Sequence, residues 1–220
     1  MNTPESTTSG NVHAMPLAAL LGNRPDELAS IGSSPSVRAE DTMLVGIRTL
    51  DEAEKARVRA SGVHVFTMKD IDREGIATIA DRAIVLVTNS TGGLHVSFDM
   101  DVCDLSIAPG VGTPVKRGLN YREAHMIMEL VADSGRLLAL DLVEVNPTLD
   151  LRNATALLAA ELALSALGKH ILQAPSPSRE HRFNFIHHPV HRRHCLGKWF
   201  VGRHIDPGIL QQIDGVLRRA

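Results

Sequence analysis

Two carboxylates stand one residue apart near the middle of the chain. They belong to Asp99 and Asp101, at the end of the apolar and β-branched stretch over residues 94–101. In an extended strand, residues i and i+2 point to the same side, so this spacing predicts that both carboxylates face one spot. Two close anions repel each other unless a cation or a shared proton lies between them. The spacing therefore favours a site for Mg²⁺, Mn²⁺ or a similar divalent ion, and the alternative is a strand end whose carboxylates face solvent.

The elements that must position these side chains follow from an alternation of short apolar runs with helical stretches. From about residue 42 onward, this alternation predicts parallel βαβ units and therefore an α/β fold. Strands are expected over residues 43–47, 63–66, 94–101 and 137–145. A charged helix or turn is expected over residues 50–60. Helices are expected over residues 71–87, 121–134 and 153–172, with Asn153 as the N-cap of the last helix.

Further carboxylates follow other predicted strands. Asp51 comes after the first strand, and Glu144 ends the fourth. In parallel α/β sheets, ligands bind beyond the carboxyl ends of the strands. We therefore expect both residues to join the aspartate pair at one edge of the sheet. Such an edge would suit a cationic substrate, a metal ion, or both.

The composition is that of an ordinary soluble protein. At 220 residues, 44% hydrophobic and 22% charged, the chain can bury a sizeable core as one domain plus extensions. No apolar run reaches the roughly 18 residues that a membrane span needs. The two cysteines, Cys103 and Cys195, form no disulfide framework. We therefore expect a cytoplasmic protein that does not engage a membrane.

Charge is distributed unevenly along the chain. Residues 173–220 carry eight Lys and Arg against three Asp and Glu, whereas the remaining residues have a net charge of −7. With the Pro- and Ser-rich segment 174–178, this asymmetry predicts a domain over residues 1–172 and a basic, His-rich extension over 173–220. The His and Cys residues of 187–195 could bind zinc but lack the paired spacings of a zinc finger, and a basic tail could touch nucleic acid. We prefer a disordered extension and expect no nucleic-acid partner.

The N-terminal segment over residues 2–13 is rich in hydroxyl and amide groups. A loop of this kind can surround a carboxylate with neutral hydrogen-bond donors. The alternative is a disordered N-terminus, which is the common state of a terminal segment.

Three segments, in this order along the chain, resemble the arginase family. Residues 2–13 are similar to the loop that receives the amino-acid end of arginine. Residues 97–101 (SFDMD), with residues 112–114 (GTP), resemble the family's second metal-binding motif. Residues 144–147 (EVNP) resemble the segment whose glutamate meets the guanidinium group.

The similarity runs from Asn2 to about Leu172 and implies a three-layer αβα sandwich with a mainly parallel sheet, incomplete on its N-terminal side. The wider ureohydrolase family includes agmatinases, which share the SFDxD segment. The N-terminal loop and the EVNP segment favour arginase among them, because agmatine has no α-carboxylate for such a loop to hold.

The resemblance implies which residues bind the amino-acid end of the substrate L-arginine. Asn2, Ser9 and Asn11 would contact its carboxylate. Asp51 would reach its α-amino group through a polar network, with Glu54 nearby.

The resemblance also implies the residues at the reacting end. Glu144 would pair with the guanidinium group, with Thr113 close by. Asp99 would bridge two Mn²⁺ ions, and Asp101 would bind one of them. His13 would be the catalytic proton shuttle. In arginases a metal-bridging hydroxide attacks the guanidinium carbon and produces urea and L-ornithine, so the activity combines metal activation of water with substrate positioning.

Two other metal-binding segments of the arginase family, similar to GGDHS and DAHxD, do not occur in this chain. The resemblance therefore implies an N-terminally truncated site that lacks four of the family's six protein metal ligands, and we do not expect a binuclear Mn²⁺ cluster to form in it. The strand that carries DAHxD would lie inside the sheet, between the first and third strands predicted here. Its absence is expected to leave backbone groups unpaired or to force a non-native pairing.

We therefore expect an arginase-like hydrolase that is inactive as this chain alone. The alternatives are a non-catalytic arginase remnant or arginine-binding module and, among enzymes, an agmatinase-like ureohydrolase. The family also implies a homo-oligomer, as a trimer or hexamer.

Overall fold

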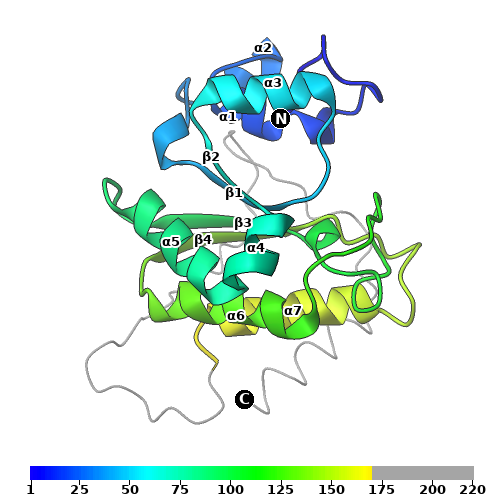
Figure 1. Ribbon diagram of the computed structural model, residues 1–220. Helices are drawn as coiled ribbons and strands as arrows, with labels where there is room; N and C mark the ends of the chain where they lie inside the picture. The colour runs from blue at the N-terminus through cyan, green and yellow to red at the C-terminus, as the bar shows by residue number, and fades with distance from the viewer. Residues whose placement is uncertain (170–220) are drawn as a thin grey trace, which may run out of the picture. The chain divides into compact units, whose positions relative to one another are not determined.

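Two pairs of parallel strands lie at the centre of the fold (Figure 1). β1 (Met43–Ile47) pairs with β2 (His64–Thr67), and β3 (Leu94–Asp99) pairs with β4 (Leu137–Val143). The structure is a computed structural model that describes residues 1–169, and residues 1–168 form one compact unit. The α/β class with parallel strands, predicted from the sequence, is confirmed.

No β-ladder joins the two pairs within residues 1–169, so β1 and β3 each have only one hydrogen-bonded neighbour. Helix α5 (Ile76–Thr88) contacts both of these strands and so spans the two pairs. The break in the sheet lies between the first and third strands. This is the place where the family resemblance predicts an absent strand, and no β-ladder joins β1 to β3 there.

Helices connect the strands and cover them. α3 (Glu52–Ser61) links β1 to β2, and α6 (Tyr121–Asp133) lies between β3 and β4 in the chain. α6 packs against α5 and α7 (Ala154–Ala166), and α5 and α7 contact the β3–β4 pair. Figure 1 shows these three helices along the same side of that pair.

The helix expected over residues 71–87 is in fact two helices. α4 (Met68–Glu74) begins with a capping box between Thr67 and Asp70, and it ends at Gly75, where α5 begins. Gly75 has φ +83°, a conformation that favours glycine and breaks the helical path. Apolar periodicity continues across this break, so periodicity alone could not reveal it.

The predicted cap of the last helix is wrong in its chemistry. Asn153 does occupy the position before α7, but its side chain makes no capping hydrogen bond and its φ is +60°. Instead, the Asp150 carboxylate accepts hydrogen bonds from the backbone N–H groups of Thr155 and Ala156, at 3.0 and 3.1 Å. A carboxylate at a helix N-terminus satisfies free N–H groups and favours the helix dipole.

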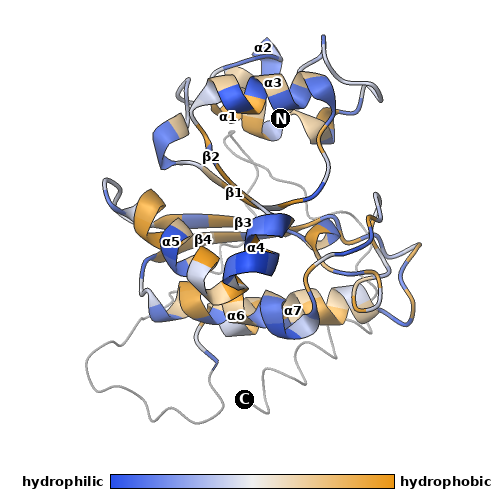
Figure 2. Ribbon diagram, in the orientation of Figure 1, coloured by the Kyte–Doolittle hydropathy of each residue, from blue (hydrophilic) through white to orange (hydrophobic). Residues whose placement is uncertain are grey.

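The main core lies between the β3–β4 pair and helices α5, α6 and α7. Its largest fully buried side chains are Ile79, Met100, Leu119, Met128 and Leu162. In Figure 2 the strands and α5 are largely apolar, whereas α4 is mainly hydrophilic. The core therefore includes the carboxyl end of β3, because Phe98 and Met100 are buried on either side of Asp99.

The N-terminal region contains short elements that the sequence did not predict. These are η1 (Val12–Ala14), α1 (Pro16–Leu20), α2 (Asp26–Ala29) and η2 (Ala39–Asp41). Another unpredicted element, η3 (Met100–Val102), follows β3.

Within the described part of the chain, no helix is long and apolar enough to cross a membrane. The predictions for the extension over residues 173–220, and for the end of the last helix beyond residue 169, lie outside the described residues.

Candidate functional site

Asp99 and Asp101 lie together, but not in the way that an extended strand would place them. β3 ends at Asp99, and Asp101 belongs to the 3-10 turn η3. The Asp99 Oδ1 atom accepts a hydrogen bond of 2.8 Å from the backbone N–H of Asp101. The prediction from strand alternation is therefore corrected, because a local turn rather than the pleat brings the two side chains together.

The two carboxylate oxygens of Asp101 have different surroundings. Oδ2 accepts a hydrogen bond from the Thr113 hydroxyl. Oδ1 is buried and has no hydrogen-bond partner among the described residues. A buried acceptor without a partner loses its hydration without compensation, so it is a place where a cation or a donor would be stabilising.

The environment of Asp99 disfavours its ionised form. Desolvation is the main cause, and with the nearby carboxylates of Asp101 and Glu144 it raises the pKa of Asp99 from 3.8 to about 6. The Asp101 N–H and the Arg48 guanidinium oppose this rise. The carboxylates of Asp99, Asp101 and Glu144, from two strand ends, thus interact electrostatically.

Glu144 follows β4 directly, in the left-handed region with φ +65°. β4 therefore ends at Val143, two residues earlier than the sequence predicts. Its Oε1 lies 3.6 Å from Nδ1 of His13, and both side chains are partly exposed. The N-terminal segment is therefore folded back onto the carboxyl end of the β3–β4 pair.

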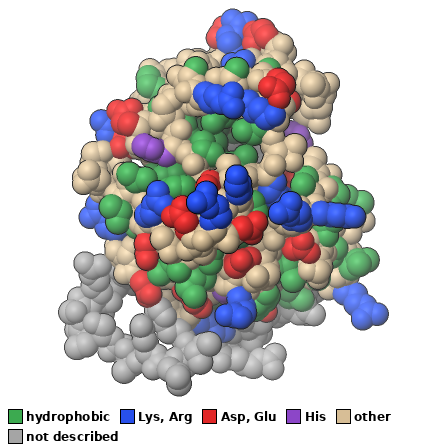
Figure 3. All heavy atoms as spheres, in the orientation of Figure 1, with side chains coloured by type: hydrophobic (Ala, Val, Ile, Leu, Met, Phe, Trp, Pro, Cys, Tyr) green, Lys and Arg blue, Asp and Glu red, His purple; other side chains and the backbone are tan. Residues whose placement is uncertain are grey.

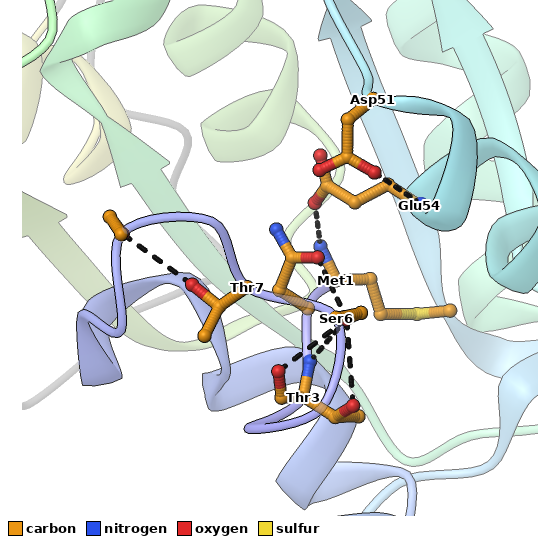
Figure 4. A network of polar contacts seen from close by, with 8 residues as sticks. Met1, Thr3, Ser6, Thr7, Asp51 and Glu54 are labelled. Carbon is orange, nitrogen blue, oxygen red and sulfur yellow. Dashed lines mark hydrogen bonds and ion pairs between the residues drawn. The ribbon is translucent and has the colours of Figure 1, made fainter.

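The N-terminal loop is held by its own hydroxyl and amide groups (Figure 4). The buried Asn2 side chain accepts a hydrogen bond of 2.9 Å from the Ser6 hydroxyl, and its backbone N–H donates to Ala14 O. The Ser9 hydroxyl accepts from the backbone N–H of Asn11, and both residues are exposed. The loop is thus ordered by internal contacts. Ser9 and Asn11, two of the three residues predicted to contact the substrate carboxylate, are exposed to solvent.

Asp51 and Glu54 form a separate group with the N-terminal segment. The Asp51 Oδ1 atom caps α3 by accepting from the Glu54 N–H at 2.8 Å. The Glu54 Oε1 atom lies 2.5 Å from the amino nitrogen of Met1 (Figure 4). No contact of the described residues joins Asp51 to the other three acids, so its predicted place among them is not borne out by the contacts.

Arg48 is a positioning residue that the sequence analysis missed. Its guanidinium donates hydrogen bonds to the backbone carbonyls of Asp101, Val102 and Val115. It therefore ties the end of β1 to the turn that holds Asp101 and to the loop after Thr113. The available signal was a cation directly after the first predicted strand, at the edge where the acids were expected.

The described residues do not fit a binuclear Mn²⁺ site. Asp99 and Asp101 offer two carboxylates, and the unpartnered oxygen of Asp101 is one available ligand atom. However, no group of three His, Cys, Asp or Glu side chains within residues 1–169 lies close enough to hold a metal ion. Manganese usually takes an octahedral set of mainly oxygen ligands, so two carboxylates leave most positions unfilled.

Comparison with protein families finds that the model described as "Arginase family" matches residues 1–168. The arginase of Bacillus caldovelox is 44% identical over 173 residues, which cover 78% of this chain and 58% of that protein. Its crystal structure superimposes with a TM-score of 0.76 over 78% of this chain and 57% of its own. The chain therefore spans somewhat more than half the length of these relatives.

Two further solved structures show the same likeness. The arginase of Bacillus subtilis is 42% identical, with a TM-score of 0.75 over 78% of this chain and 60% of its own. The arginase of Entamoeba histolytica, in complex with L-ornithine, is 32% identical, with a TM-score of 0.72 over 77% of this chain and 56% of its own.

Proposed function

The chain belongs to the arginase family, and from this premise we propose that residues 1–169 form the arginine-binding side of an amidine-hydrolase site. The proposed reaction is the hydrolysis of L-arginine to L-ornithine and urea. The observation that supports it best is the approach of His13 to Glu144, because it joins the N-terminal loop to the carboxyl ends of β3 and β4. One end of the site then carries neutral donors and the other carries carboxylates.

The charges of this arrangement match those of arginine. Glu144 would pair with the guanidinium group, and Thr113 beside Asp101 would fix the loop that lines it. Asn2, Ser9 and Asn11 would receive the carboxylate, while Asp51 and Glu54 would face the α-amino group. His13, 3.6 Å from Glu144, would move the proton to the leaving amine.

Hydrolysis itself requires a nucleophile that these residues do not supply. Asp99 and Asp101 are the residues of this chain that would contribute to holding a metal ion, and the chemistry that such an ion supplies is the activation of water. Because residues 1–169 hold no group of three potential ligands, we propose that this chain alone binds arginine without turning it over. A cytoplasmic location and a trimeric or hexameric assembly remain part of the proposal.

Calorimetric titration with L-arginine and with agmatine tests the binding role. We expect arginine to bind about tenfold more tightly, because agmatine lacks the carboxylate that the N-terminal loop would hold. Glu144→Gln should weaken arginine binding, whereas the exposed Glu27→Gln is a matched control that should not. Equal affinities for the two ligands would refute the arginine assignment.

Urea release from L-arginine with added Mn²⁺ tests the enzymatic role. A rate no higher than that of Asp99→Asn is expected for this chain alone and supports the non-catalytic alternative. A rate well above that of the variant would show that the chain, as it stands, is an active hydrolase.

A further inference from the structure

A cavity separate from the candidate site lies beside the β1–β2 pair. Its volume is about 870 Å³, within the range of small-molecule sites. It is bordered by α3, by the carboxyl ends of β1 and β2, and by residues 115–117. Arg48 borders both places, but none of the acids or N-terminal loop residues of the candidate site lines the cavity. Figure 3 shows this side of the molecule hollowed below α3, with Lys and Arg side chains on its borders.

The floor of the cavity is apolar, whereas its border is polar. Val58 of α3, Val63 before β2 and Met68 of α4 line it and are buried, and Ile47 and Val65 add to the same surface. An apolar floor of this size favours an organic ligand with a flat or aliphatic body, because burying such a body removes apolar surface from water.

The border of the cavity is strongly basic. Six cationic side chains line the cavity, whereas the one carboxylate among its lining residues is that of Asp72. These are Arg48, Lys55, Arg59, Lys69, Lys116 and Arg117. This excess of positive charge produces a positive potential, and the low-dielectric walls of a cleft concentrate that potential inside it.

Half of these cations already have partners. Lys55 lies 2.6 Å from Glu52, Arg117 lies 3.7 Å from Asp72, and Arg48 donates to backbone carbonyls. Among residues 1–169, Arg59, Lys69 and Lys116 form no ion pair within 4 Å, although Arg59 and Lys69 interact electrostatically with Glu52 and Asp70, which do not line the cavity. These last three side chains are exposed and come from α3, α4 and the 115–117 segment, so their charges converge from separate parts of the chain.

We propose that this cavity binds a small organic polyphosphate of the nucleoside polyphosphate class. The phosphates would lie at Arg59, Lys69 and Lys116, since ammonium and guanidinium groups bind phosphate oxygens strongly. The ring system would lie on the apolar floor. The basic residues 173–220 are unsuitable occupants, because their net positive charge would be repelled from this border.

Calorimetry on the full chain in EDTA tests the proposal, with ATP, tripolyphosphate and adenosine as probes. ATP should bind at one site, tripolyphosphate more weakly and adenosine not measurably. Lys69→Glu and Lys116→Glu should each raise the Kd for ATP about tenfold, and Arg59→Gln should raise it less, because it removes a charge without reversing it. Arg122→Glu, an exposed change of equal charge on α6 outside the cavity, should alter the Kd less than twofold.

Three results would overturn the proposal. The first is an absence of ATP binding to the unaltered chain. The second is a loss of ATP affinity in Arg122→Glu as large as in the cavity variants, or an unchanged ATP affinity in Lys69→Glu and Lys116→Glu. Either result would mean that ATP binds to the general positive surface or to the basic tail rather than in the cavity. The third is tripolyphosphate binding as tightly as ATP, which would show that the apolar floor is not used. Unchanged thermal unfolding of each variant establishes that it is folded, and arginine binding is measured separately because it does not involve this cavity.

Discussion

Asp99→Asn should stabilise the protein at neutral pH, although it removes a proposed metal ligand. The pKa of Asp99 is raised from 3.8 to about 6, mainly by desolvation. The folded state therefore holds its proton up to a higher pH than the unfolded state does. Stability from this group is present below pH 3.8 and is lost as the pH rises through about 6.

The magnitude follows from the size of the shift. A pKa difference of about two units between the folded and unfolded states corresponds to about 3 kcal/mol of unfolding free energy. Asp99 is exposed as a residue, so solvent screening reduces the expected gain to about 1 kcal/mol. For a folded region of this size, that gain raises the unfolding midpoint by roughly 2–4 °C. Asparagine suits this position, because its carbonyl oxygen can still accept the hydrogen bond from the Asp101 N–H.

Thermal unfolding followed by circular dichroism, in EDTA at pH 4.5 and pH 7.5, measures the effect. The advantage of Asp99→Asn should be clear at pH 7.5 and small at pH 4.5. Asp104→Asn is the matched control with the opposite sign, because hydrogen bonds from Ser106 lower the pKa of Asp104. That variant should lose stability at pH 7.5. An Asp99→Asn variant that is less stable than the parent at pH 7.5, or whose advantage does not change with pH, would refute the reasoning.

Three other substitutions examine how the site is supported. Arg48→Met removes hydrogen bonds to three backbone carbonyls and should cost about 1–3 kcal/mol of unfolding free energy in urea titrations. It should also raise the pKa of Asp99 further, which carboxyl NMR titration detects. Asp150→Ala removes the cap of α7 and should cost about 1 kcal/mol in the same urea titrations. In a Cys195→Ser background, Cys103 should not react with a thiol reagent at pH 8 until the protein is unfolded, because burial raises the pKa of its thiol to about 12.

Much of the strand framework could be predicted because short apolar runs between polar turns have few alternative structures. Each of the four strands lies within two residues of its expected bounds. The gathering of Asp99, Asp101 and Glu144 followed from a general property of parallel strands, whose carboxyl ends share one edge. These predictions needed only local pattern and topology.

The parts that could not be predicted depend on side chains far apart in the sequence. The contacts of Arg48 with Asp101, Val102 and Val115 exist only after folding, and residue type alone does not distinguish this arginine from a solvated one. The turn at Asp101 depends on a hydrogen bond from its own backbone to Asp99, which competes with strand geometry. The Asp150 cap lies three residues from the expected N-cap, and the loop before α7 must fold back to place it.

The same turn explains how an unfavourable site can be held in place. Asp99 and Asp101 flank Met100, which is fully buried, and Thr113 follows closely on the fully buried Val111. Burial of such side chains contributes a few kcal/mol each, which exceeds the cost of about 1 kcal/mol estimated for the charge of Asp99. The core can therefore hold the carboxylates of this edge close together even though they repel each other, and an oxygen of Asp101 can remain without a partner. The core beneath this strand end therefore supports an unfavourable arrangement of charges that the carboxylates alone would not maintain.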